Sequence, residues 1–342
     1  MKNNAIVFDY SNLCQRCLHL TQVRAESENP SWDLMKFMIF DKLFEFVLDA
    51  GSDFNGDCDV ILALDSHSGY WRRGIYPPYK ADRAAKRASS NIDYARAFQE
   101  FSELAEAIKR FLPWRVIEVA GCEADDVIYT VAKTYKGIVS IHSADSDYIQ
   151  LVDEKTRLYR ANDGDWFHFP YRCKAGKSKI VGLNREEFLE VAILTGQGGK
   201  DNVYNILTDT DWSGVRKPGF GVVAALKLLE CEDIRAELEA RGCFGNYLRN
   251  KKLIDMTELP EEEFTKISEA LSSCETVNDV TGFIDYYSWP SLLAGTRREE
   301  VLFGIPSVCG LQGPSLVEEE IDETKSDTWE DFSDFGDFSM EA

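Results

Sequence analysis

Three short apolar runs, each ending in an aspartate, constrain the fold more than any other feature of this sequence. They are AIVFD at 5–9, VILALD at 60–65 and GIVSIHSAD at 137–145. Continuous β-branched runs of this length are typical of strands buried on both faces. Between them, apolar residues recur at helical spacing: Met35, Ile39, Leu43 and Phe46, then Phe98, Phe101, Leu104, Ala105 and Ile108. The alternation predicts an α/β fold with a mostly parallel sheet flanked by helices.

The aspartates at the ends of these runs are Asp9, Asp65 and Asp145. In an open parallel sheet, ligands bind beyond the carboxyl ends of the strands, so residues distant in sequence meet at one edge. A single aspartate in such a place is more often a helix or turn cap. Three of them are harder to explain as caps, and we expect them to form one site.

The segment GCEADDVI at 121–128 adds Glu123, Asp125 and Asp126 within four positions. Two carboxylates about 4 Å apart repel each other by roughly 1 to 4 kcal/mol, depending on how wet the site is. A divalent cation would offset that repulsion, and a helix start is the alternative, because acids are favoured in a first turn. Glu123 and Asp125 can reach the same site only if Glu123 precedes the helix.

Two further acids extend the cluster. Asp147 follows Asp145 by two residues, and Asp201 stands in the glycine-rich segment TGQGGKDNV. So many acids with hardly any His or Cys favour hard cations, Mg²⁺ or Mn²⁺ rather than zinc. Carboxylate sites with two such ions are used in phosphodiester hydrolysis.

The net charge of −21 argues at first against a nucleic-acid partner, but the charge is unevenly distributed. The segment from 316 onward has eleven acids and one lysine, whereas 71–87 has six basic residues and one aspartate. Within this basic stretch Lys80, Arg83 and Arg87 recur on one helical face, and Tyr76 and Tyr79 are available to stack on bases. The alternative is a solvated charged helix. Its position just after Asp65 favours phosphate binding.

The sequence contains no run of about 18 uncharged apolar residues, which a membrane-spanning helix requires. Its nine cysteines are scattered and odd in number, as is typical of reduced thiols. We therefore expect a cytoplasmic protein with no membrane partner.

Six motifs carry a resemblance to a known family, in that family's order: VFDYSN, ALDSHSGYWRR, CEADD, SADSDYIQL, KDNV and PGFGVVAALKLL. The chain resembles the 5′-nucleases, which include flap endonucleases and 5′ to 3′ exonucleases, and within them the phage ribonucleases H. The resemblance implies a PIN-like, Rossmann-like catalytic domain at 1–195 with a basic helical arch at 70–95. It also implies a helical DNA-binding subdomain at 196–310 with a helix-hairpin motif, followed by a disordered acidic tail at 316–342.

The resemblance implies two Mg²⁺ or Mn²⁺ ions. Asp9, Asp65, Asp125 and Asp145 would hold the first ion with Glu123 nearby, and Asp126, Asp147 and Asp201 would serve the second. Lys80 and Arg87 would contact the scissile phosphate, beside the catalytic Asp125 and Asp145. The nucleic-acid contacts would be Arg72 and Arg73 at the arch entrance, Tyr79, Lys80, Arg83, Arg87, Lys200, and Gly219 and Gly221 in the hairpin, where a K⁺ ion would bind.

Two positions depart from the family pattern. Gly198 stands where the family usually has an aspartate, three residues before Asp201. The second ion is therefore expected to be held more loosely. In addition, the segment 203–217 separates KDNV from PGFG, which many relatives join almost directly, so the duplex-binding element is expected to be displaced or remodelled.

The combined prediction is a Mg²⁺-dependent 5′ to 3′ exonuclease and flap endonuclease with ribonuclease H activity. It would remove RNA primers and flaps from lagging-strand fragments in phage DNA replication, in the host cytoplasm. The alternatives are a structure-specific DNA-binding protein with weak or no nuclease activity, and a phosphatase-like or receiver-like protein with an acidic pocket.

The acidic tail has phenylalanines at 332, 335 and 338. It would dock into a single-stranded DNA-binding protein or a sliding clamp, cover the chain's own arch, or serve only solubility.

Overall fold

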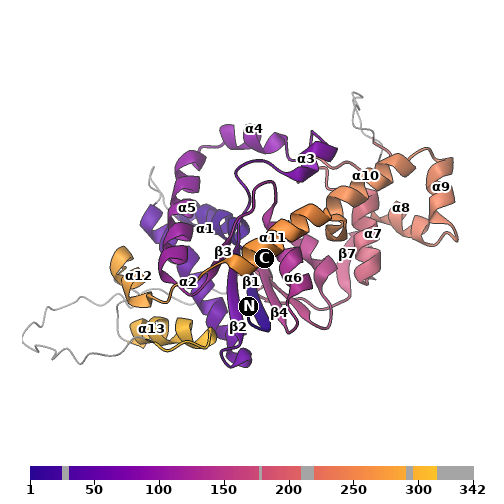
Figure 1. Ribbon diagram of the computed structural model, residues 1–342. Helices are drawn as coiled ribbons and strands as arrows, with labels where there is room; N and C mark the ends of the chain where they lie inside the picture. Colours follow the sequence, from indigo (N-terminus) through magenta and orange to yellow (C-terminus); the bar gives the residue numbers. More distant parts are fainter. Residues whose placement is uncertain (25–30, 177–178, 209–218, 290–295, 314–342) are drawn as a thin grey trace, which may run out of the picture.

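The computed structural model describes residues 1–24, 31–176, 179–208, 219–289 and 296–313 (Figure 1). Six strands form one sheet in the order β3-β2-β1-β4-β5-β6, and every neighbouring pair is parallel except β5 with β6. The strands are β1 (Asn4–Asp9), β2 (Cys58–Ala63), β3 (Arg115–Ile117), β4 (Val139–Ser143), β5 (Thr156–Arg160) and β6 (Asp165–Trp166). The predicted fold class and its three central strands are confirmed.

The register of the central strands explains why the aspartates meet. β1 lies between β2 and β4, with Asp9 opposite Ala63 and Phe8 opposite His142. The three strands therefore end at the same level, and Asp65 and Asp145 each follow two residues after their strand. The chain runs from β1 through β2 to β3 on one side and then crosses to β4 on the other side of β1. The carboxyl ends of β1 and β4 therefore lie at a switch point, where α/β proteins bind ligands.

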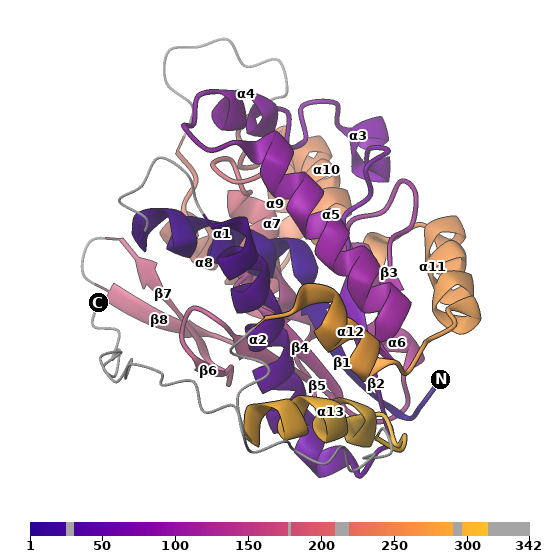
Figure 2. The same ribbon diagram turned by 90° about the vertical axis from the view of Figure 1, so that its left-hand side faces the viewer.

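Helices α1 (Tyr10–Arg24), α2 (Trp32–Gly51) and α5 (Tyr94–Phe111) cover one face of the sheet (Figure 2). The predicted apolar stripe of α2 is buried, and so is that of α5 apart from Phe98. Phe98 is 39% exposed and lies beneath the guanidinium of Arg87. The helical periodicity therefore predicted the buried residues of α2 and α5 correctly, except for Phe98.

Helix α6 (Ala124–Thr134) packs on the other face of the sheet. The further helices of this side are α7 (Arg185–Thr195), α8 (Val222–Leu229), α9 (Ile234–Ala240), α10 (Phe244–Ile254) and α11 (Glu261–Ser273). The described residues also form the 3₁₀ helices η1 (Ser52–Phe54), η2 (Ser146–Leu151) and η3 (Met256–Glu258). An antiparallel hairpin, β7 (Tyr171–Ala175) and β8 (Lys179–Leu183), interrupts the α/β alternation and was not predicted.

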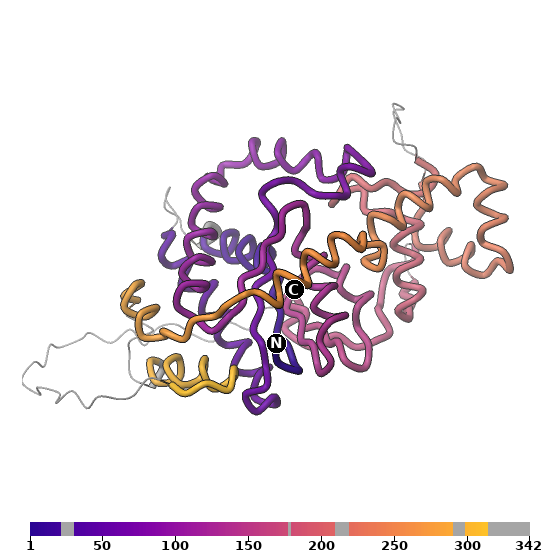
Figure 3. The backbone as a smooth tube through the Cα atoms, in the orientation of Figure 1, coloured from indigo at the N-terminus to yellow at the C-terminus, as the bar shows by residue number. Residues whose placement is uncertain are grey.

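The second half of the chain is predominantly helical, as predicted. Its last helices, α12 (Val280–Tyr287) and α13 (Thr296–Val308), return to the first half, where α12 packs on α5 and α13 on α2 (Figure 3). The boundary at residue 195 stays a prediction, and the predicted tail at 316–342 lies outside the described residues. Among the described residues, no helix is long and apolar enough to cross a membrane.

The segment predicted as an arch, 70–95, contains two short helices, α3 (Trp71–Ile75) and α4 (Asp82–Ala88), at the top of the molecule in Figure 1. Lys80 precedes α4 and has a left-handed backbone with φ of 54°. The predicted helical face of Lys80, Arg83 and Arg87 is therefore wrong at its first member. Left-handed φ is uncommon for a residue other than glycine, and here the backbone N–H of Lys80 donates to the carbonyl of Asp201 at 3.0 Å.

Two tyrosines anchor the base of this segment. Tyr76 and Tyr79 are buried in a small apolar cluster with Ile193, Val203 and Leu253. The prediction that they are available for base stacking, which included Tyr79 as a nucleic-acid contact, is wrong because packing against α7 and α10 covers both rings. The Tyr79 hydroxyl donates instead to Glu123 at 3.1 Å.

Candidate active site

The centre of the site is a pair of carboxylates joined through one buried hydroxyl. The hydroxyl of Tyr148 lies 2.6 Å from Asp125 Oδ1 and 3.2 Å from Asp9 Oδ2. Ser143, the last residue of β4, also donates to Asp9 Oδ2, at 3.0 Å. Sequence reasoning missed both hydroxyl residues, although Tyr148 belongs to the motif SADSDYIQL and follows Asp145 by three residues.

Asp65 joins this pair from the end of β2. Its Oδ1 accepts a hydrogen bond at 3.1 Å from the backbone N–H of Ala124, the first residue of α6. The next residue of α6 is Asp125, so the helix start brings the two carboxylates to the same region. The charges of Asp65 and Asp145 both act on Asp9, and the convergence of the strand-end aspartates on one ion stays a prediction.

These carboxylates repel one another strongly. Burial, together with the charges of Asp125, Asp65 and Asp145, raises the pKa of Asp9 to about 8. Burial also raises the pKa of Asp65, against the opposing effect of Lys80. Burial disfavours ionised Asp125 too, but Lys80, Lys200 and Arg72 outweigh it, and the pKa of Asp125 lies below its usual value. A cation bound beside these side chains would favour their ionised forms.

The donor set is consistent with a hard divalent ion. Asp9, Asp65 and Asp125 form no ion pair with any basic side chain in the described part of the chain. Oxygen-only donors of this kind suit Mg²⁺ or Mn²⁺. Within the same residues, no three His, Cys, Asp or Glu side chains already converge as a ready metal site. An ion at this place would therefore draw the three carboxylates together.

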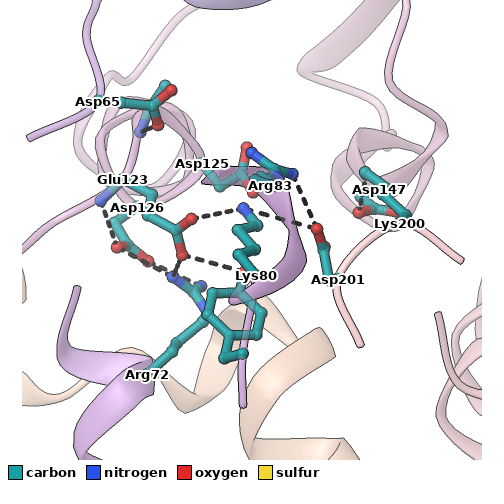
Figure 4. Close-up of polar contacts among 12 residues, drawn as sticks. Asp65, Arg72, Lys80, Arg83, Glu123, Asp125, Asp126, Asp147, Lys200 and Asp201 are labelled. Carbon is teal, nitrogen blue, oxygen red and sulfur yellow. Dashed lines mark hydrogen bonds and ion pairs between the residues drawn. The ribbon is translucent and has the colours of Figure 1, made fainter. Parts of the chain in front are cut away.

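The other two acids of GCEADDVI have a different environment. Glu123 is the N-cap of α6, with extended backbone, and its N–H donates to Asp126 Oδ2 at 2.9 Å. Both side chains are 1% exposed and both bind Arg72, whose Nη1 lies 2.8 Å from Glu123 Oε2 and whose Nη2 lies 2.8 Å from Asp126 Oδ1 (Figure 4). The segment thus combines the two explanations given for it, a cation site and a helix start. Asp125 belongs to the carboxylate group of the site, whereas Glu123 and Asp126 form the capping box of α6.

The prediction that Arg72 contacts nucleic acid at the arch entrance is wrong. Its side chain is 4% exposed, and its Nε donates to the carbonyl of Leu253 at 3.2 Å in addition to the two carboxylates. A guanidinium fully occupied inside the protein is not an arch-entrance contact for nucleic acid. Arg73, the next residue, is exposed and lies over the ring of Tyr70. Its predicted role stays a prediction.

Two more basic residues of the arch segment bind acids of the chain itself. Lys80 Nζ is 2.5 Å from Glu123 Oε1 and 4.0 Å from Asp201 Oδ1. Arg83 Nη2 is 2.8 Å from the same Asp201 oxygen. Lys80 and Arg83 therefore lie beside the carboxylates, as predicted, but in this structure they neutralise Glu123 and Asp201. Their contacts with a phosphate remain predictions.

Lys200 has a similar place at the other end of the site. Its Nζ lies 2.5 Å from Asp145 Oδ2 and 2.7 Å from Asp147 Oδ2. Gln197 Nε2 donates to Asp147 Oδ1 at 2.8 Å, a contact that sequence reasoning missed. Asp145 caps η2 and accepts from the N–H of Asp147 at 3.0 Å. The two acids meet through this 3₁₀ turn, because β4 ends before them.

The remaining predicted residues lie away from the carboxylates. Arg87 is exposed on α4 with its guanidinium 5.4 Å from the centre of the Phe98 ring. Gly219 and Gly221 precede α8, and Gly221 is its N-cap. Most of the insertion before them, 209–218, lies outside the described residues. The hairpin motif and its K⁺ ion stay predictions.

Comparison with known proteins identifies the family. Residues 4–179 match the family described as 5′-3′ exonuclease, N-terminal resolvase-like domain. The ribonuclease H of Enterobacteria phage T4 is 24% identical over 216 residues, which are 60% of this chain and 67% of that protein. The flap endonuclease Xni of Shewanella sp. strain MR-4 is 32% identical over 143 residues, 41% of this chain and 50% of Xni. The match with Xni thus spans only half of that relative.

Solved structures agree in fold. The flap endonuclease of bacteriophage T5, in a pseudo-enzyme-product complex with DNA and metal ions, has a TM-score of 0.55 at 16% identity, covering 79% of this chain and 98% of that one. The T5 5′-exonuclease with bound zinc has a TM-score of 0.54 at 15% identity, covering 80% and 100%. At these identities the likeness establishes the fold alone. Because the family match spans half of the chain, from β1 to the start of β8, this protein belongs to the 5′-3′ exonuclease family.

Proposed function

We propose that this protein is a Mg²⁺-dependent nuclease that cleaves phosphodiester bonds at the 5′ ends of RNA·DNA hybrids, DNA duplexes and flaps. The observation that carries the proposal is the group of Asp9, Asp65 and Asp125, which repel one another at the switch point of the sheet and have no basic partner among the described residues. Relatives named as ribonuclease H and flap endonuclease support the substrate class.

The side chains divide the work as follows. Asp9, Asp65 and Asp125 would hold a divalent ion, which would supply Lewis acidity for phosphodiester hydrolysis. Tyr148 and Ser143 hold Asp9 and Asp125 in place through their hydroxyls. Lys80, 7% exposed and fixed by Glu123, supplies a positive charge next to the reacting phosphate.

The exposed basic residues of the arch segment would position the substrate. Arg73 and Arg87 are exposed, and they bind phosphates of the strand that enters the site. The segment around Gly219 and Gly221 binds duplex DNA through its backbone, with a K⁺ ion. In a phage-infected cell this activity removes RNA primers and flaps, and the tail at 316–342 binds a single-stranded DNA-binding protein or a sliding clamp.

The test uses two substrates of the same sequence, a 5′-labelled RNA·DNA hybrid and a 5′-flap DNA, incubated with Mg²⁺ or with EDTA. We expect short labelled products from both substrates in Mg²⁺ and none in EDTA. Asp125→Asn is the control, because it leaves the fold and the arch in place but removes a ligand charge. Cleavage that persists in EDTA or in Asp125→Asn would overturn the proposal, and product lengths show whether exonuclease or flap cleavage dominates.

A second function is favoured by one observation. Asp126, Asp147 and Asp201 are each paired with a basic residue of the chain, at 2.8, 2.7 and 2.8 Å. A site whose acids are neutralised internally suits a structure-specific DNA-binding protein with weak chemistry. Tight binding of the flap substrate with no cleavage at any Mg²⁺ concentration would support this alternative over the nuclease.

A further inference from the structure

The acids of the site fall into two groups when they are sorted by their partners. Among the residues that the structure describes, the hydrogen-bond partners of Asp9, Asp65 and Asp125 are hydroxyls and backbone N–H groups. The others are ion-paired: Glu123 and Asp126 with Arg72, Asp201 with Arg83, and Asp145 and Asp147 with Lys200. The unpaired group is expected to hold the first ion. The paired group includes every acid that the family resemblance assigns to a second ion.

Lys200 binds both Asp145, which the resemblance assigns to the first ion, and Asp147, which it assigns to the second. Its Nζ lies within 2.7 Å of one oxygen of each carboxylate. The remaining oxygens are also used, since Asp147 Oδ1 accepts from Gln197 at 2.8 Å and Asp145 Oδ1 from the N–H of Asp147 at 3.0 Å. All four carboxylate oxygens therefore have a donor from the chain. A divalent ion would have to displace the ammonium to reach them.

The turn that carries Lys200 is held in position by its own backbone. The N–H groups of Lys200 and Asp201 donate to the carbonyl of Gln197 at 3.1 and 2.9 Å, and Gln197 donates to Val203 at 2.6 Å. Gly196 has φ of 67°, and an added Cβ there would lie 2.4 Å from the Val203 carbonyl oxygen. The lysine is thus presented by a fixed loop.

The same turn leaves little room for the acid that the family usually has at position 198. An added Cβ on Gly198 would lie 3.2 Å from the ring of Tyr204, a tight contact. Gly198 therefore supplies no carboxylate to the site, whereas Lys200, two residues later, binds Asp145 and Asp147.

We propose that Lys200 takes the place of the second divalent ion in this protein. One divalent ion is held by Asp9, Asp65 and Asp125, and the ammonium of Lys200, fixed by Asp145 and Asp147, is the second positive charge of the centre. This inference rests on the proposed nuclease function. It deepens that function, because the fixed charge makes activity depend on the binding of a single ion.

The test counts bound ions with Mn²⁺ as the probe, by isothermal titration calorimetry and by the electron paramagnetic resonance signal of free Mn²⁺. We expect wild type to bind about one Mn²⁺ per chain and Lys200→Ala to bind about two, because the mutation leaves the two carboxylates of Asp145 and Asp147 open. Lys200→Gln, which keeps the side-chain length without the charge, should also gain the second ion. Lys136→Ala removes an equal charge from an exposed turn before β4 and should leave the count unchanged.

Three results would overturn the inference. They are two ions bound by wild type, one ion bound by both Lys200 variants when their circular dichroism melts match wild type, and a second ion gained by Lys136→Ala as well. The failure of the proposed function looks different. Wild type would then bind no Mn²⁺ and would cleave neither the hybrid nor the flap, whereas a wild type that binds two ions and cleaves both would overturn the lysine replacement alone.

Discussion

Two neighbouring arginines provide the most direct test of how this site is built. Arg72 is buried and joins Glu123 to Asp126, whereas Arg73 is exposed and donates to the Tyr79 carbonyl at 3.3 Å. Removing one partner of a buried ion pair costs about 3 to 5 kcal/mol, because a charge is left buried without compensation. In Arg72→Met, Glu123 keeps Lys80 and Tyr79, while Asp126 keeps only neutral donors.

We therefore expect Arg72→Met to lower the free energy of unfolding by about 4 kcal/mol, most of it from Asp126. The guanidinium of Arg72 also lies 4.5 Å from the centre of the Trp71 ring, so tryptophan fluorescence during urea denaturation reports the change. Arg73→Met removes the same charge from the surface and should change the free energy by less than about 1 kcal/mol.

An equal, small effect of both substitutions would refute the buried-network account. It would be refuted more strongly if Arg72→Met kept the stability of wild type and lost only affinity for flap DNA, since that is the behaviour of an arch-entrance contact. The double variant Arg72→Met with Asp126→Asn separates the cost of leaving Asp126 unpaired from the other effects of losing Arg72. Removing both charges together should recover part of the loss, because no unpaired carboxylate then remains at position 126.

Three further predictions concern Asp9, Arg87 and His142. Asp9→Asn relieves repulsion and should raise the free energy of unfolding in metal-free buffer by about 1 to 2 kcal/mol, measured in urea, while it abolishes cleavage. Arg87→Ala should lower the slope of log affinity against log salt by about 1 for flap DNA, with stability unchanged. Desolvation lowers the pKa of His142 to about 4, so the unfolded state binds more protons between about pH 6.5 and 4, and stability falls by about 3 kcal/mol as the pH drops through that window. His142→Phe should flatten this fall, and an unchanged slope would contradict it.

The sequence was sufficient for the three central strands of the sheet, whereas β3, β5, β6 and the hairpin of β7 and β8 appeared only in the structure. Strands buried on both faces usually have continuous apolar runs, and β1 is of this kind. β4 is equally buried, although it includes Ser140, His142 and Ser143. The alignment of the strand ends then follows from parallel pairing. Asp9, Asp65 and Asp145 could be assigned to one edge without coordinates for this reason, because each stands at or just after the end of a parallel strand.

The pairing of charges could not be predicted in the same way. Whether an acid faces an ion or an arginine depends on contacts across long separations, such as the 51 residues between Arg72 and Glu123. The spacing of Lys80 and Arg87 likewise suggested one helix, but a tertiary hydrogen bond from Lys80 to Asp201 starts α4 after the lysine. Local periodicity does not include such contacts, so the helix boundary and the internal ion pairs appeared only in the structure.

These ion pairs change how much of the basic segment a nucleic acid can use. Of its six basic residues, Arg72, Lys80 and Arg83 neutralise carboxylates of the protein itself. Arg73, Lys86 and Arg87 are exposed and pair with no carboxylate in the described part of the chain. The three paired residues tie the arch segment to the acids of the site, and the three exposed, unpaired residues remain for phosphates. The affinity of an acidic protein for a polyanion thus depends on a small number of contacts, which makes each of the three exposed residues count for a large share of its salt dependence.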